Sequence, residues 1–168
     1  MESLEQTRIS NVTEYLIHIY QAEELLREYN FDLGKLANEH LEGKEKEQAW
    51  YADLAATMES DGVKDSGHIA SANAVAKELS EIHFHLLKSD RTYRGHFDQA
   101  KLHINRHMAA HGGDLQNPIQ MCLDGIFLFK HARANQQSVD EQALESMQAF
   151  NVLCSYLGYR YKAKHEGE

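Results

Sequence analysis

Apolar residues recur every three or four positions through almost the whole chain, which is the spacing of one face of an α-helix. The chain has a single proline, Pro118, among its 168 residues. Since proline interrupts helices, its near absence leaves long helices unbroken. The pattern therefore predicts an all-α protein. We expect a single domain over residues 1–168, a bundle of five to six mostly antiparallel helices.

Capping residues and glycines indicate where the helices begin and end. Asn11 with Glu14, and Ser138 with Glu141, each have the spacing of a capping box at a helix start. Pro118 suits the first turn of a helix that is apolar nearly all round, so we expect that helix to be the most buried. With a short helix near residues 32–41, the expected helices cover about residues 10–29, 44–60, 65–88, 90–111, 118 onward and 138–161.

Length and composition predict a cytoplasmic protein that is stable without disulfides. A chain of 168 residues can bury ~70% of its unfolded surface. Cys122 and Cys154 lie in apolar segments, where free thiols act as small hydrophobic groups in a reducing compartment. The first residues do not read as a secretion signal, and no apolar run approaches the ~18 residues of a membrane span. We expect no membrane partner.

Charge is distributed unevenly along the chain, whose net charge is -9. Residues 1–60 hold thirteen acidic and five basic residues, which makes nucleic acid an unfavourable partner there. Residues 61–114 hold seven of each, together with seven of the eleven histidines. The middle of the chain is therefore the segment where histidine chemistry is expected.

Three histidines form a candidate metal site. His103, His107 and His111 are spaced i, i+4, i+8 and so lie on one side of the helix expected over residues 90–111. Neighbouring members of this set can share a transition metal such as zinc, but a complete site needs a further ligand from another helix. The alternatives are that they are boundary residues between core and solvent, or that this basic stretch binds anions. Their protonation below neutral pH would make the face positive.

A second group of residues predicts a buried polar pocket. His83 falls on the apolar face of its helix, and a buried imidazole needs hydrogen-bond partners. Acidic or hydroxyl groups of the first helix, such as Glu14, Tyr15, Glu23 and Glu24, are suitable partners. The alternative is a polar network that only fixes how the helices pack. The candidate pocket residues are Glu14, Glu24, Trp50, His68, Glu78 and His83.

Several short segments carry a resemblance to a known family. They are Thr13-Glu14-Tyr15-Leu16 with the segment 21–27, Trp50-Tyr51, Ser66-Gly67-His68 with Glu78 and His83, Leu86-Leu87-Lys88, Met121-Cys122-Leu123 and Ser138. In this register the chain resembles a bacterial family defined as a domain of unknown function. The resemblance implies an all-helical fold of about this length. It implies no activity, so it assigns no catalytic residue.

Three functions are compatible with these observations, and the sequence contains no nucleotide-binding loop, catalytic triad or complete metal motif. The first is a non-enzymatic module that binds a protein or small molecule and self-associates as a homo-oligomer, with no cofactor. The second is an enzyme or small-molecule binder with a His/Glu pocket around His83. The third is a histidine-based metal-binding bundle. Whether the protein is an enzyme is left open by the sequence.

Overall fold

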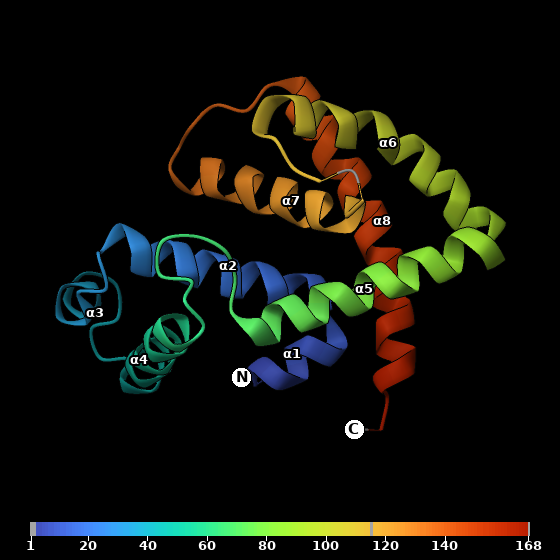
Figure 1. Cartoon of the computed structure of the whole chain (residues 1–168). Coiled ribbons are helices and arrows are strands. Elements are labelled where there is room, and N and C mark those ends of the chain that lie inside the picture. Colours follow the sequence, from blue (N-terminus) through green and yellow to red (C-terminus); the bar gives the residue numbers. More distant parts are fainter. Residues whose placement is uncertain (1–2, 115, 168) are drawn as a thin grey trace. The chain divides into compact units, whose positions relative to one another are not determined.

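The computed structural model describes residues 3–114 and 116–167, and in these ranges it contains eight α-helices and no strand (Figure 1). The helices are α1 (Leu4–Ser10), α2 (Val12–Glu28), α3 (Leu33–His40), α4 (Glu45–Ser60), α5 (Ala70–Ser89), α6 (Arg91–His111), α7 (Pro118–Ala134) and α8 (Glu141–His165). The predicted all-α class is confirmed, whereas the predicted number of five to six helices is wrong. Over the described residues, none of these helices has both the length and the apolar character needed to span a membrane.

The short helices α1 and α3 raise the number of helices above the predicted five to six. α1 begins with a capping box, because Ser3 Oγ accepts from the backbone N–H of Gln6 while Gln6 Oε1 accepts from the N–H of Ser3. Asn11 then separates α1 from α2, and its Oδ1 accepts from the N–H of Glu14 at 3.1 Å. α3 is capped by Asp32, as its position in the sequence suggested. Short helices carry little periodicity, so caps are the main signal for them.

The start of α5 differs from its predicted position near residue 65. The side chain of Arg27 donates hydrogen bonds to the backbone carbonyls of Val63, Lys64 and Gly67 at 2.6–3.2 Å. Gly67 has a φ of 88°, a left-handed conformation that favours glycine and does not occur within a helix. These carbonyls are therefore held by a side chain from α2, and α5 begins only at Ala70.

The start of α8 also differs from the prediction. Ser138 was expected to cap this helix, but the cap is Asp140, whose Oδ1 accepts from the N–H of Ala143 at 2.7 Å. A carboxylate at this position both accepts the hydrogen bond and interacts favourably with the positive end of the helix dipole. Two residues with similar capping ability thus compete here, and the charged one caps the helix.

The chain divides into two compact units, and each is described separately. One consists of His18–Ala74, and the other of the residues up to Ile17 together with those from Val75 onward. In the unit His18–Ala74, α3 packs against α4. Glu23 is fully buried there, where its carboxylate accepts from the N–H of Ile69 at 2.9 Å and contacts the ring of His68 at 2.8 Å.

In the other unit α8 is the central element, and it packs against α1, α6 and α7 (Figure 1). The first half of α7 is buried, as predicted from its apolar composition, and includes Ile119, Cys122 and Ile126. Its second half turns toward solvent, and Leu128 is 37% exposed. The exposed half of α7 contributes to the cavity described next.

Candidate functional site

Helices α6, α7 and α8 line an open hollow of about 440 Å³, which we call the histidine cavity. Its volume lies in the ~300–1,000 Å³ range of small-molecule sites. Its lining residues are Arg106, His107, Ala110 and His111 of α6, Gly125, Leu128, Phe129, His131 and Ala132 of α7, Gln137, Val139 and Asp140 of the connecting segment, and Gln142, Ala143, Ser146, Met147 and Phe150 of α8.

The spacing of histidines along α6 directs two of them into the cavity. His107 and His111 are one helical turn apart, and their ring centroids are separated by 4.8 Å. His103 lies one turn earlier, where its Nδ1 is 2.9 Å from the hydroxyl of Ser146 on α8. α6 ends at Gly112, which has a φ of 76°. Two of the three predicted metal ligands therefore line the cavity, and the third connects its walls.

Part of the cavity lining is apolar, and a glycine lets a phenylalanine approach α7 there. A Cβ atom built on Gly125 would lie 2.5 Å from Cε2 of Phe150, which is closer than side-chain atoms pack. With no side chain at this position, Phe150 packs directly against the backbone of α7. Phe129 and Met147 also line the cavity. The lining thus contains apolar side chains as well as polar groups.

The permanent charge of the cavity comes from Arg106. With its amide oxygen directed at the guanidinium, Gln142 accepts hydrogen bonds from Nε and Nη1 of Arg106 at 3.2 Å each. No carboxylate forms an ion pair with Arg106 among residues 3–114 and 116–167. The carboxylate of Asp140 lines the cavity too, but it caps α8. The cavity wall therefore carries a cation whose charge is not neutralised by the fold.

The histidines add charge that depends on pH. Burial lowers the pKa of His107 below its ordinary value, and the neighbouring His111 lowers it further, while Asp124 acts in the opposite direction. At neutral pH the imidazole of His107 is therefore uncharged. It becomes a cation only when the pH falls or when an anion binds beside it.

Of the three histidines predicted to bind a metal, His107 and His111 line the cavity and His103 does not. Within the part of the chain that the structure describes, no three His, Cys, Asp or Glu side chains are grouped so as to hold one metal ion. His131 lines the cavity from α7, and its Nε2 is 3.1 Å from the side-chain amide of Asn135. Zinc binding by these histidines stays a prediction.

Three of the predicted pocket residues lie in the unit His18–Ala74. Glu24 forms an ion pair with Arg27 at 3.6 Å. The ring centroid of Trp50 lies 5.2 Å from that of His18. His68 contacts the buried carboxylate described above. Each of these side chains thus has a local partner in its own unit.

The carboxylates predicted for the pocket in the other unit also have local partners. Glu14 Oε2 accepts from the side-chain amide of Asn11 at 3.1 Å. Glu78 Oε1 lies 2.8 Å from Lys164 Nζ and 2.7 Å from His165 Nε2. Burial acts to raise the pKa of Glu78, but the hydrogen bonds from Lys164 and His165 outweigh it and lower that pKa. Glu78 therefore serves as the counterion of α8.

His83 is fully buried, as its position on the apolar face predicted, and its partner is a tyrosine. Its Nδ1 lies 2.6 Å from the hydroxyl of Tyr93, whereas Nε2 has no hydrogen-bond partner among the described residues. Burial lowers the pKa of His83 to about 4 and raises that of Tyr93, which the nearby thiols of Cys154 and Cys122 raise further. Both groups are therefore neutral, and they form a polar pair inside the core.

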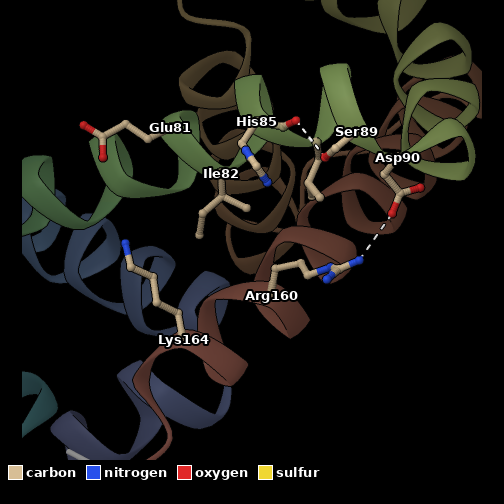
Figure 2. Close-up of a pocket in the computed structure, with 8 residues that line it drawn as sticks. Glu81, Ile82, His85, Ser89, Asp90, Arg160 and Lys164 are labelled. Carbon is tan, nitrogen blue, oxygen red and sulfur yellow. Dashed lines mark hydrogen bonds and ion pairs between the residues drawn. The ribbon is translucent and has the colours of Figure 1, made fainter.

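A second hollow, the charged groove, lies between α5 and α8 and has a volume of about 380 Å³. Figure 2 shows Arg160 extending toward Asp90, with Lys164 one turn further along α8. Asp90 Oδ2 accepts from the hydroxyl of Tyr156 at 2.5 Å and lies 3.4 Å from Arg160 Nη2. The hydrogen bond from Tyr156 is the main cause of the lowered pKa of Asp90. The other lining residues are Glu81, Ile82, His85, Leu86 and Ser89.

Several residues of the histidine cavity were not identified from the sequence. Arg106 was recognised only as one base in a basic stretch, and His131, Gln142 and Phe150 were not singled out. Gly125 is a cavity residue that the sequence could have indicated, because an isolated glycine inside an apolar helical run usually marks a close approach of another element. The contact of Gly125 with Phe150 is such an approach.

Over residues 1–168 the chain matches the model of the family described as a domain of unknown function (DUF4924). The chain therefore belongs to this family, which confirms the resemblance noted in its sequence. Neither the curated proteins nor the solved structures include one that matches it. The description of the family assigns no activity, so the functional argument depends on the cavity itself.

Proposed function

We propose that this member of the DUF4924 family is a non-enzymatic binding protein whose ligand is a small molecule held in the histidine cavity. The observation that carries the proposal is a cavity whose lining combines apolar side chains with an arginine, an amide and histidines. Sites for small molecules are typically apolar hollows with a few placed polar groups and perturbed titratable residues. The histidine cavity has the volume and the mixed lining expected of such a site.

The walls of the cavity are held in place by hydrogen bonds between helices, which favours binding. The contacts of His103 with Ser146 and of Arg106 with Gln142 both join α6 to α8. A site formed before the ligand arrives loses less conformational entropy on binding than one that must be ordered. The polar groups of the cavity are donors and acceptors suited to holding a ligand in one orientation.

Binding can be followed at the methionine methyl groups by NMR. Met147 lines the cavity, whereas Met58 lies in the other unit and reports non-specific effects. With ¹³C-methyl methionine, we expect octan-1-ol, octanoate or octylammonium to shift the Met147 resonance saturably and to leave Met58 unchanged. Failure of all three probes to move Met147 would contradict the proposal.

A matched pair of variants tests whether the ligand occupies the cavity. Ala132 lines the cavity near the end of α7, and Ala134 lies two residues further on that helix, is exposed and does not line it. We expect Ala132→Trp to abolish the saturable shift of Met147 and Ala134→Trp to retain it. Urea unfolding of both variants establishes that they are folded. Equal binding by the two variants would place the ligand elsewhere.

We also propose that the protein self-associates through α8. Leu144, Val152 and Tyr159 are 42%, 48% and 73% exposed, and they lie within about 80° of one another around the helix axis. Exposed apolar residues on one side of a helix are typical of an interface. We expect Val152→Glu to lower the sedimentation-derived mass and Gln99→Glu, which adds the same charge at an exposed position of α6, to leave it unchanged. A monomeric wild-type protein would refute this proposal.

A further inference from the structure

The proposed binding function leaves the chemical class of the ligand open, and the charges around the cavity restrict it. On α6, Arg106 is permanently cationic, and His107 and His111 can each take up a proton. On α7, His131 lines the cavity and Asp124 interacts with His107. At the start of α8 the only lining acid is Asp140. Basic groups therefore outnumber acidic groups around the cavity, in a protein whose net charge is -9.

The two carboxylates near the cavity are engaged within the fold. Asp140 Oδ1 accepts from the N–H of Ala143 at 2.7 Å as the cap of α8. Asp124 Oδ1 accepts from the side-chain amide of Gln120 at 2.9 Å. Neither forms an ion pair with Arg106 in the described parts of the chain. Within those parts the guanidinium of Arg106 is hydrogen-bonded only to a neutral amide, so its positive charge is not compensated and some of its N–H donors remain available. A guanidinium can bind a carboxylate through two hydrogen bonds.

The half-buried His107 of α6 couples ligand charge to pH. Its ring centroid is 4.8 Å from that of His111, and burial together with this neighbour disfavours the protonated form of His107. An anion beside the ring offsets this cost and favours the protonated form. By thermodynamic linkage, protonated His107 must bind the anion more tightly by the same factor. Affinity for an anion should therefore rise as the pH falls through the range in which histidine titrates.

The apolar lining determines the rest of the ligand. Leu128, which is 37% exposed, and Phe129 line the cavity together with the buried Met147 and Phe150, and a purely hydrophilic anion would leave this lining without an apolar contact. Burying a CH₂ group on such a surface contributes ~0.8 kcal/mol. A ligand with a carboxylate at one end and a hydrocarbon body uses both parts of the cavity.

We infer that the histidine cavity binds an organic carboxylate with an apolar body, and that protonation of His107 strengthens this binding. The inference rests on the proposed function, and it adds the class of ligand and the regulation by pH. It also separates the cavity from the charged groove, where Arg160 and Lys164 already have carboxylate partners.

Three probes of equal chain length and different charge test the ligand class. Octanoate, octan-1-ol and octylammonium are titrated against the full chain at about pH 7.5 and about pH 5.5, with the Met147 methyl resonance as the readout. We expect octanoate to bind at least tenfold more tightly than the other two at the lower pH. If octan-1-ol binds as tightly as octanoate, the cavity binds ligands but the inference about the anion is wrong. If none of the three binds, the proposed function itself fails.

Matched variants assign the effect to particular residues. We expect Arg106→Gln to weaken octanoate about tenfold and Arg91→Gln, an exposed arginine at the start of the same helix, to have no effect. His107→Gln should abolish the pH dependence, and His85→Gln, a histidine of the charged groove, should retain it. Persistence of the full pH dependence in His107→Gln would overturn the role of protonation. Unchanged octanoate binding in Arg106→Gln would overturn the role of the guanidinium.

Discussion

The histidine cavity and the charged groove belong to the same compact unit, and both present basic side chains, but these side chains are engaged differently. In the groove, Arg160 meets Asp90 at 3.4 Å and Lys164 meets Glu78 at 2.8 Å. In the cavity, Arg106 is hydrogen-bonded to a neutral amide. A cation paired within the fold contributes to its stability, whereas an unpaired one remains available to a ligand. The number of charges around a hollow is therefore a weaker guide to function than their pairing.

The two regions also differ in the apolar surface that accompanies the charge. The groove has Ile82 and Leu86 between its charged residues. The cavity has Phe129, Met147 and Phe150, which present a larger and more polarizable surface. This difference favours an amphipathic ligand in the cavity and internal ion pairing in the groove.

Acidification should have the largest effect on stability, because the buried His83 lies on α5, the helix that also lines the groove. The pKa of this imidazole is about 4 in the fold and 6.5 in the unfolded chain, so the folded state binds fewer protons. Its contribution to stability is complete above about pH 6.5 and is lost as the pH falls toward 4. We expect the free energy of unfolding in urea to decrease by up to about 3 kcal/mol over this range.

The partner of His83 provides the control for this measurement. Replacing both groups, His83→Leu with Tyr93→Phe, removes the titrating imidazole and leaves no buried hydroxyl without its partner. We expect stability of this double variant to depend much less on pH between 6.5 and 4. Retention of the wild-type dependence would assign the acid sensitivity to other groups.

Gly125→Ala should have the next largest effect, and it acts on the cavity. The added Cβ would lie 2.5 Å from the ring of Phe150, so the ring or the helix must move, at a cost of about 1–3 kcal/mol in the free energy of unfolding. Gly95→Ala on α6 is the matched control, since no atom lies within 4 Å of its added Cβ and alanine favours a helix by about 1 kcal/mol. Urea unfolding should therefore give opposite signs for the two variants. A stabilised Gly125→Ala would show that Phe150 is not confined by α7.

Removing Glu78, the carboxylate partner of the groove residue Lys164, should cost less, because this ion pair is partly exposed to solvent. Glu78→Gln should destabilise the protein by less than about 1 kcal/mol at neutral pH and low salt. Since the pKa of Glu78 is lowered in the fold, this difference should be full above the ordinary carboxyl value of 4.5 and disappear as the pH falls below it. Glu81→Gln, on the same helix, is the control with a smaller expected effect. Equal losses for the two would mean that the pairing of Glu78 contributes nothing.

Arg106→Gln should have the smallest effect on stability. Because this guanidinium has no carboxylate partner in the described residues, its loss should change the free energy of unfolding by no more than about 0.5 kcal/mol. The same variant is expected to bind octanoate more weakly. Arg106 would then contribute to ligand binding without contributing to the stability of the fold. A destabilisation as large as that of Glu78→Gln would remove the distinction between the cavity and the groove.

Local patterns in the sequence predicted much of the fold. Periodicity gave the long helices, and Asn11, Asp32 and Pro118 correctly indicated helix starts. At α8, two residues only two positions apart could each cap the helix, and Asp140 does so in place of Ser138. The other error occurred where a distant group decided the local structure, because Arg27 of α2 holds the carbonyls before α5.

The candidate site was predicted only in part, and for the same reason. The spacing of His107 and His111 placed them on one side of a helix, because that spacing is a property of the helix alone. Their neighbours Gln142 and Phe150 come from α8, more than thirty residues away, so no pattern in the sequence connected them. The partner of His83 was expected among the acidic and hydroxyl groups of the first helix, whereas the structure supplies the hydroxyl of Tyr93 on α6.

The sequence by itself determined the all-α class, the family and the side of α6 on which the histidines lie, since these depend on interactions within a few residues of one another. Only the tertiary structure decided which charges are paired. Pairing depends on distances between side chains of different helices, and a shift of a few ångströms changes an ion pair into a free cation. The contrast between Arg106 and Arg160 is a property of that packing, and the proposed function depends on it.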